Sequence, residues 1–373
     1  MEELNSPANV DNSVHPFAKD TPLALIPVYL MEEANQSILL YEGAMEVNFG
    51  SQETRARGNG ILHLKWFPSI QIEFEITNAT PVNSPIDFFH VSEKNDKLSL
   101  TMLETGISSA CSMLAVTFDD SYKLGGKLER VVIGESNAKL KYLLVHLVNF
   151  SDFTGDDILY VFKSASGYRR SRYRGRLTFE AEGWRVTVDA MNNSSQIFKE
   201  LDNQRGYAFT HTAKLEKVKT DEFFSTDEVE KFLLALLFFF SFVRGIYSTP
   251  FLPIGFDSNE KKVWELWKVS MVSSWTYVHS WFSGKHNSES LTAIFPNFIS
   301  YWNNPNWNNP LLWSINWYVE SNQGNGTPDG RIIWVQSALE LLSWTYFVTE
   351  GRMKEEEFNF SILNNKKRLM NEH

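Results

Sequence analysis

The stretch FFSTDEVEKFLLALLFFFSFVRG, residues 223–245, decides how the chain is divided. Ser225 is followed three residues later by Glu228, which is the spacing of a capping box at the start of a helix. The residues after it are apolar on nearly every side, and Gly245 provides a C-terminal stop. Because a helix without a polar face belongs in a core, we expect this helix to join two halves of the chain.

Before this helix, apolar residues recur with a period of two. In SIQIEFEIT, residues 69–77, Ile72, Phe74 and Ile76 alternate with polar residues, as in a strand with one buried face. Similar short runs follow one another, and turn-forming residues separate most of them. The pattern predicts an antiparallel β domain over residues 21–221, a sandwich or an open barrel, of which we favour the sandwich-like form.

After this helix, the signals are helical. Asn309 with Pro310, and Thr327 with Pro328, are cap and first-turn pairs ahead of apolar segments. The second segment carries an apolar stripe at helical spacing, made of Ile332, Val335, Leu339, Leu342 and Tyr346. The fold class predicted is therefore α+β, with a loose arm over residues 1–20 and an α-helical bundle over residues 222–373.

Composition limits the class of protein. The chain has 373 residues, a net charge of -10, 43% hydrophobic and 21% charged residues, which is typical of a soluble globular protein. Its one cysteine, Cys111, forms no intramolecular disulfide and no cysteine metal cluster, which favours a reducing, cytoplasmic setting. The longest apolar run would make only about 18 Å of helix, short of the roughly 30 Å of a bilayer core. We therefore expect no membrane contact, no metal and no cofactor.

The segment YRRSRYRGR, residues 168–176, is strongly basic in this acidic chain. Arginine pairs bidentately with phosphate, and both arginine and tyrosine stack on bases. The alternation places Arg174 and Arg176 on the outward face of a strand, after a loop that holds the other three arginines. Two interpretations stay open: a site for an anionic partner such as RNA, or a solvated hairpin rim whose charges pair with neighbouring acids. The candidate nucleic-acid-binding residues are Arg169, Arg170, Arg172, Tyr173, Arg174 and Arg176.

Other motifs favour structural roles. The common hydrolase, metalloprotease and phosphate-loop signatures are missing from the sequence. The glycine-rich QGNGTPDGR, residues 323–331, follows a predicted helix and not a strand, which favours a linker. The repeated WNNP presents Trp302 and Trp307 either as stacking platforms or, as we favour, as packing residues.

The segments GRIIWVQSALELLSWTYFV, residues 330–348, and FLLALLFFFSFVRGIYSTPFLPIGFD, residues 232–257, resemble ApeA-like bacterial abortive-infection proteins. Those proteins join a β-rich N-terminal domain to a helical HEPN-type domain. The resemblance implies a homodimer through the helical part and metal-independent RNA cleavage by an Arg and a His four to six residues apart. Here RLMNEH supplies Arg368 and His373. In this chemistry the His would assist proton transfer at the 2'-hydroxyl, and the Arg would hold the phosphate.

The function expected from this resemblance is bacterial antiviral or stress defence, with an endoribonuclease as its active form. The family motif comes after a further stretch of helix, so the resemblance implies that the chain ends before the motif or that the domain is catalytically silent. The alternative is a non-catalytic binding or regulatory protein that docks an anionic partner through residues 169–176. A third hypothesis, a carbohydrate or peptide binder built on the β domain, comes from the high aromatic content alone.

Overall fold

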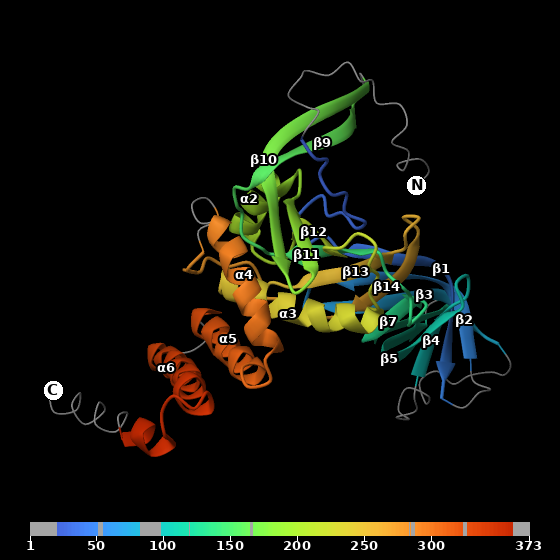
Figure 1. Cartoon of the computed structure of the whole chain (residues 1–373). Coiled ribbons are helices and arrows are strands. Elements are labelled where there is room, and N and C mark those ends of the chain that lie inside the picture. Colours follow the sequence, from blue (N-terminus) through green and yellow to red (C-terminus); the bar gives the residue numbers. More distant parts are fainter. Residues whose placement is uncertain are drawn as a thin grey trace.

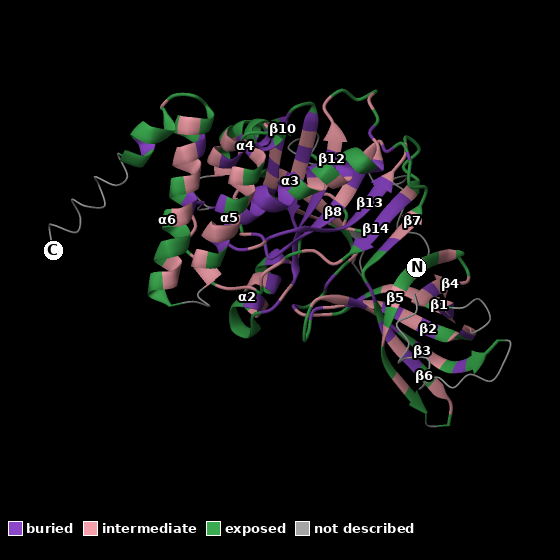
Figure 2. Ribbon diagram, turned by 90° about the horizontal axis from the view of Figure 1, so that it is seen from below, coloured by how far each residue is buried: buried purple, intermediate pink, exposed green. Residues whose placement is uncertain are grey.

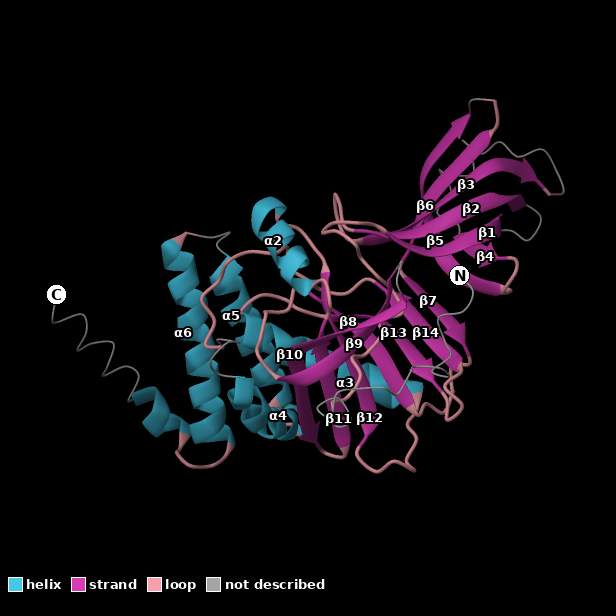
Figure 3. Cartoon of the chain, turned by 90° about the horizontal axis from the view of Figure 1, so that it is seen from above, coloured by secondary structure: helices cyan, strands magenta, loops and turns pink. Residues whose placement is uncertain are grey.

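The computed structural model describes residues 21–50, 55–82, 98–118, 120–164, 167–282, 284, 288–323 and 327–360. These residues form a β-barrel, a large antiparallel sheet and a set of C-terminal helices, which follow one another across the molecule (Figure 3). The α+β class is therefore as predicted.

The first six strands close into a barrel in the order β1-β2-β3-β6-β5-β4. Alternation explains the closure: in β3, Ile72, Phe74 and Ile76 are buried inside the barrel, while Glu73 and Glu75 face outwards. The barrel replaces the first layer of the expected sandwich, because β1 pairs with both β2 and β4 and leaves no open edge. The strands are β1 Ile38–Phe49, β2 Arg55–Lys65, β3 Gln71–Pro81, β4 Leu98–Met102, β5 Ile107–Phe118 and β6 Tyr122–Leu128.

The other eight strands form one antiparallel sheet in the order β7-β14-β13-β8-β12-β11-β10-β9. Helix α2, Ser194–Gln204, connects β11 to β12. The strands are β7 Arg130–Gly134, β8 Tyr142–Val148, β9 Asp156–Ser164, β10 Gly167–Ala181, β11 Trp184–Ala190, β12 Phe209–Lys217, β13 Pro250–Phe256 and β14 Lys262–Lys268.

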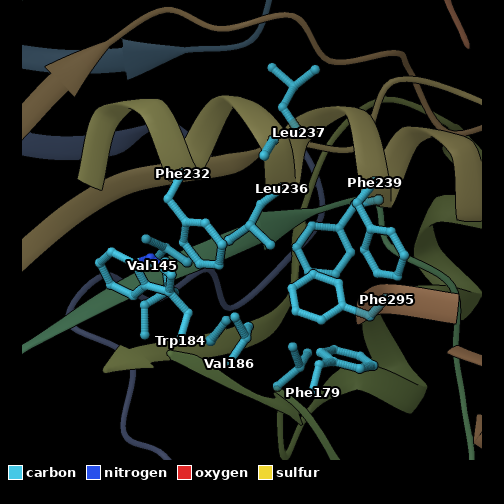
Figure 4. Packing of buried hydrophobic residues seen from close by; sticks show 14 of the residues in the cluster. Val145, Phe179, Trp184, Val186, Phe232, Leu236, Leu237, Phe239 and Phe295 are labelled. Atoms are coloured by element: carbon cyan, nitrogen blue, oxygen red, sulfur yellow. The ribbon is translucent and has the colours of Figure 1, made fainter. Parts of the chain in front are cut away.

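Helix α3, Thr226–Arg244, covers one face of this sheet (Figure 1). The predicted capping box is confirmed, since the Ser225 side chain accepts from Glu228 N and the Glu228 side chain accepts from Ser225 N. Figure 4 shows Phe232, Leu236 and Phe239 directed from α3 toward residues of the sheet. Phe232 stacks on Trp184 with the ring centroids 4.6 Å apart. The helix thus supplies the centre of the largest hydrophobic core, as its apolar circumference indicates.

The region expected to be helical from residue 222 also contains β13 and β14, and this corrects the predicted boundary. After the left-handed C-cap at Gly245, the chain returns to the sheet and inserts β13 between β8 and β14. Six of the seven residues of β13 are buried on both faces of the sheet, so the run has no alternating pattern. The strand-forming segment therefore could not be told from a helix by its periodicity.

Three helices and a π-helical turn follow, namely α4 Ser288–Asn303, α5 Asn308–Gln323, α6 Pro328–Trp344 and η2 Thr345–Thr349, and residues 355–360 at the end of the described chain are helical as well. The cap predicted at Thr327 is confirmed, since its side chain accepts from Gly330 N, whereas Asn309 lies inside α5, which begins one residue earlier. Helices α4 and α5 pack on α3, whereas α6 packs mainly on α5 and lies at the outside of the molecule (Figure 2). The helices therefore form successive layers beside the sheet, and not the bundle around one core that we expected.

Candidate functional site

An arginine-rich ribbon projects from the end of the large sheet (Figure 1). Strand β11 pairs with β10 only from Arg176 to Ala181, so the part of β10 before Arg176 pairs with β9 alone. We call β9 together with residues 167–176 the ribbon. The loop expected for Arg169, Arg170 and Arg172 is wrong, because all three lie in β10 opposite residues of β9. Sequence alone did not reveal this pairing, since the charged run has no apolar alternation.

One face of the ribbon is basic. Arg170, Arg172 and Arg174 alternate along β10 and therefore point to the same side. Arg172 Nη2 lies 2.6 Å from Asp157 Oδ2, and the two side chains are 50% and 38% exposed. Arg174 Nε donates to the carbonyl of Gly155 at 3.1 Å. A solvent-exposed ion pair contributes only about 0–1 kcal/mol, so a phosphate can replace Asp157 at Arg172 with little loss.

Arg176 is different and belongs to the structure of the sheet. Its guanidinium donates to both carboxylate oxygens of Asp189 at 2.7 and 2.6 Å, and Nη2 also donates to Leu23 O at 2.8 Å. The two side chains are 14% and 2% exposed. The expectation that Arg176 faces outward is therefore wrong, because the adjacent strand places a buried carboxylate opposite it.

The other face of the ribbon is aromatic. Tyr160, Phe162 and Tyr173 lie on it, and Arg169 is directly opposite Phe162. The rings of Tyr160 and Phe162 are stacked with their centroids 6.0 Å apart. Tyr173 donates to Ala190 O at 2.8 Å, and burial raises the pKa of its phenol to about 12, so it stays a protonated donor. This face offers ring surfaces beside a cationic one.

The ribbon and the rest of the chain have opposite charge. Residues 156–176 contain six basic and two acidic residues, a net charge of +4, so the remaining residues carry -14. Because exposed charges are screened within about 10 Å in 0.1 M salt, the projecting ribbon acts electrostatically as a local basic site.

The predicted catalytic pair, Arg368 and His373, lies outside the described residues. Its proposed role stays a prediction. In the part of the chain that the structure describes, no three His, Cys, Asp or Glu side chains are grouped as a metal site would require. The helices of that part include none that is long and apolar enough to cross a bilayer.

A buried polar row, which no sequence motif indicated, lies on the face of the sheet opposite α3. Arg176, Asp189, Thr212 and His146 stand directly opposite one another on β10, β11, β12 and β8. Complete burial lowers the pKa of His146 to about 4, so its imidazole is neutral at pH 7. The signal was present in YLLVHLV and WRVTVDA, where one polar residue interrupts an apolar strand.

Helix α6 carries a second candidate surface. The apolar stripe identified in the sequence points to solvent: Ile332 is 64% and Leu339 60% exposed, and Val335 and Tyr346 are exposed as well. Ala338 is the one buried residue between Pro328 and Trp344. By contrast, the favoured packing role of the WNNP tryptophans is confirmed, since Trp302 and Trp307 are buried.

Comparison with known proteins finds similarity to one group of domains. Residues 135–278 match the family model of the YopA central domain, and residues 304–372 match that of the YopA C-terminal domain. A relative from Bacillus subtilis (strain 168), the SPbeta prophage-derived uncharacterized protein YopA, is 25% identical over 348 residues, which are 92% of this chain and 75% of the relative. No solved structure matches. Neither family description mentions a HEPN-type domain, so that resemblance stays a prediction.

Proposed function

We propose that this chain is a non-catalytic binding protein that docks RNA through the β9–β10 ribbon. The observation that carries the proposal is a projecting two-stranded ribbon with three arginines on one face, in a chain that is otherwise acidic. Arg170, Arg172 and Arg174 are spaced two residues apart, which places their Cα atoms about 6.5–7 Å from each other along the strand. That spacing suits successive phosphates of one nucleic-acid backbone.

The aromatic face supports RNA in particular. Bases that are not paired can stack on Tyr160 and Phe162, and each stacked base contributes about 1–3 kcal/mol. RNA offers such bases in loops and single strands, where most sequence-specific recognition of RNA takes place. The basic face would hold the backbone while the aromatic face holds splayed bases.

Binding of a fluorescent single-stranded RNA, with DNA of the same sequence beside it, tests the proposal. Replacing Arg170 and Arg172 by Ala is expected to weaken RNA binding about 10- to 100-fold and to lower the salt slope by about 1.4. Arg185→Ala is the matched control, because Arg185 lies on neighbouring β11 and pairs with Glu180 at 2.7 Å, away from the ribbon. Unchanged affinity in the double variant, or equal loss in the control, would contradict docking at the ribbon. Equal affinity for DNA would contradict the choice of RNA.

We also propose that the chain forms a homodimer through α6. The exposed stripe follows alternating steps of three and four residues, from Ile332 through Val335, Leu339 and Leu342 to Tyr346, which is the a/d spacing of a helix–helix seam. Gln336 and Ser343, beside the seam, are uncharged, so two copies would not repel each other there.

The stripe and the turn after it expose a sizeable apolar area. Five large side chains of α6 and η2, each about half exposed and each of roughly 150–250 Å² in full, present on the order of 500 Å². A standard interface buries about 800 Å² per partner, so this surface would form the apolar centre of a contact that polar neighbours complete. The five are Ile332, Val335, Leu339, Tyr346 and Phe347.

Light scattering after gel filtration measures the proposed dimer. Leu339→Glu places a charge in the seam and is expected to give the mass of a single chain, with an unchanged circular dichroism spectrum. Ile333→Glu is the control, because Ile333 is equally exposed but lies off the stripe. A monomeric wild type, or a dimer that survives Leu339→Glu, would contradict the seam.

The ribonuclease hypothesis for bacterial defence stays a prediction. The prophage origin in the relative's name is one link to the biology of phages. RNA cleavage by the purified chain, abolished in His373→Ala, would favour catalysis, whereas binding of intact RNA would favour docking alone.

A further inference from the structure

A strap of extended chain, residues 21–31, crosses the face of the sheet opposite α3, and begins at the ribbon (Figure 1). Pro22 O accepts from Leu159 N, and Ala24 N donates to Leu159 O, both at 2.9 Å. These bonds form a parallel bridge at the outer edge of β9. The first part of the strap is therefore held as an added strand, which is a common way of binding extended peptides.

The buried polar row binds the backbone of the strap. Arg176 Nη2 donates to Leu23 O at 2.8 Å, Leu25 N donates to Asp189 Oδ2 at 2.7 Å, and Tyr29 N donates to His146 Nε2 at 3.0 Å. Since backbone groups are the same in every residue, these three contacts recognise an extended chain without selecting its side chains.

Selectivity comes from Tyr29. Its hydroxyl donates to the buried Glu265 carboxylate and accepts from Trp267 Nε1 at 3.2 Å. The Tyr29 ring also meets the His146 ring edge-on, with the centroids 5.7 Å apart. Burial and the neighbouring carboxylate both raise the pKa of this phenol, so it remains a donor at neutral pH. The end of the row is thus a pocket for a tyrosine side chain.

The strap exposes several large apolar side chains that a core segment would bury. Leu23, Ile26 and Leu30 point away from the sheet and are 63%, 70% and 63% exposed. Apolar burial is confined to the end of the strap, at Tyr29 and at Met31, which is 1% exposed. Residues 22–28 therefore gain little hydrophobic free energy from their attachment, and detaching them sacrifices mainly polar contacts, which water partly replaces.

The strap also leaves part of the row unused. Thr212 stands between Asp189 and His146, is 1% exposed, and its hydroxyl has no hydrogen-bond partner among the described residues. A buried hydroxyl without a partner is unfavourable by about 1–3 kcal/mol. A ligand that also bonded Thr212 would therefore fit the row better than the strap does.

We propose that this face of the sheet is a binding groove for an extended, tyrosine-containing peptide segment of a partner protein, and that the strap occupies the groove until the partner displaces it. Two carboxylates, Asp189 and Glu265, line the groove and disfavour a nucleic acid there. This site is separate from the RNA-docking face of the ribbon. A tethered strap has an effective concentration in the millimolar range, so a weaker free peptide does not compete with it.

The test uses the full chain with a weakened strap. Leu25→Pro removes the N–H group that donates to Asp189, and Tyr29→Phe removes the hydroxyl that donates to Glu265. The probe is a fluorescent synthetic peptide of residues 20–32. The double variant is expected to bind this peptide at least about tenfold more tightly than the wild type does. Ile26→Ala is the control, because Ile26 is exposed and should leave the groove closed.

Two outcomes would contradict the groove. One is a double variant that does not bind the peptide although fast amide exchange shows its strap to be detached, and the other is equal peptide binding by the double variant and the wild type. A peptide that carries the same two substitutions should not bind. Every chain in this test also carries Leu339→Glu, which prevents dimers through α6. A gain in mass on mixing the double variant with the other chain would then show that copies of the protein exchange straps, which would contradict a groove for a partner protein.

Hydrogen exchange of the wild type keeps the proposal testable if the double variant does not fold. Local detachment predicts that the amides of Leu25 and Tyr29 exchange at least about tenfold faster than those of β8 and β12. Equal protection would mean that the strap opens only with the whole sheet, and would overturn displacement.

Discussion

Helices α3 and α6 have the same kind of sequence and opposite surroundings. Both begin at a hydroxyl N-cap, Ser225 and Thr327, and both are apolar on nearly every side. Most residues of α3 are buried between the sheet and α4, whereas α6 buries Ala338 alone (Figure 2). The difference teaches that an apolar circumference does not by itself decide burial: within the described residues, α3 meets a whole sheet, whereas α6 packs mainly on α5.

The largest expected effect is a matched leucine truncation in the two helices. Leu236→Ala in α3 should lower the free energy of unfolding by about 2–5 kcal/mol, because Leu236 is completely buried and a cavity remains. Leu339→Ala in α6 should change it by no more than about 0.5 kcal/mol in dilute monomer. Urea unfolding at low protein concentration measures both. Similar losses in the two variants would contradict the exposed position of α6.

Acid should lower the free energy of unfolding, and the protonation of His146 alone should account for on the order of 3 kcal/mol of the loss. Burial lowers the pKa of His146 to about 4 and that of His211 to about 3, from 6.5 when exposed. Between these values the unfolded chain binds protons that the folded chain does not, so stability is full above pH 6.5 and falls as the pH drops toward 4.

Urea midpoints measured from pH 7.5 to 4.5 report this dependence. The protection of α6 amides, after correction for intrinsic exchange, should change little over the same range, because α6 contains no histidine. A flat midpoint across that range would mean that His146 and His211 are protonated as easily in the fold as in the unfolded chain.

The smallest expected effect concerns the two N-caps. Ser225→Ala should reduce global stability by about 1 kcal/mol, because the reciprocal bonds with Glu228 start a helix that the whole sheet packs against. Thr327→Ala should fray α6 by a similar local amount without moving the global midpoint. Circular dichroism melts and amide exchange distinguish the two. Equal shifts of the global midpoint would show that α6 unfolds together with the core.

Much of this architecture could be predicted from local patterns. The capping box at Ser225, the cap at Thr327 and the buried alternation in β3 all depend on neighbours within a few residues, so short stretches specify them. The β13 segment could not be placed in this way, because a strand buried on both faces loses its alternation.

The candidate sites, too, could be predicted in part from local sequence and in part only from contacts between distant residues. The arginines could be predicted as candidates, since charge is visible residue by residue. Arg176 could not be distinguished from Arg172 in this way, because Arg176 is paired with the buried Asp189 and Arg172 with the more exposed Asp157. The strap was likewise unforeseen, since its partners Asp189 and His146 are more than a hundred residues away along the chain.

By itself, the sequence determined which segments are helices or alternating strands, where the helices begin, and that a basic cluster lies in an acidic chain, because these properties follow from spacing, caps and charge. The tertiary structure alone decided that six strands close into a barrel, that α3 is covered while α6 is not, and which arginine is held internally. Those outcomes depend on contacts between distant residues, and local preferences do not encode which distant surfaces meet.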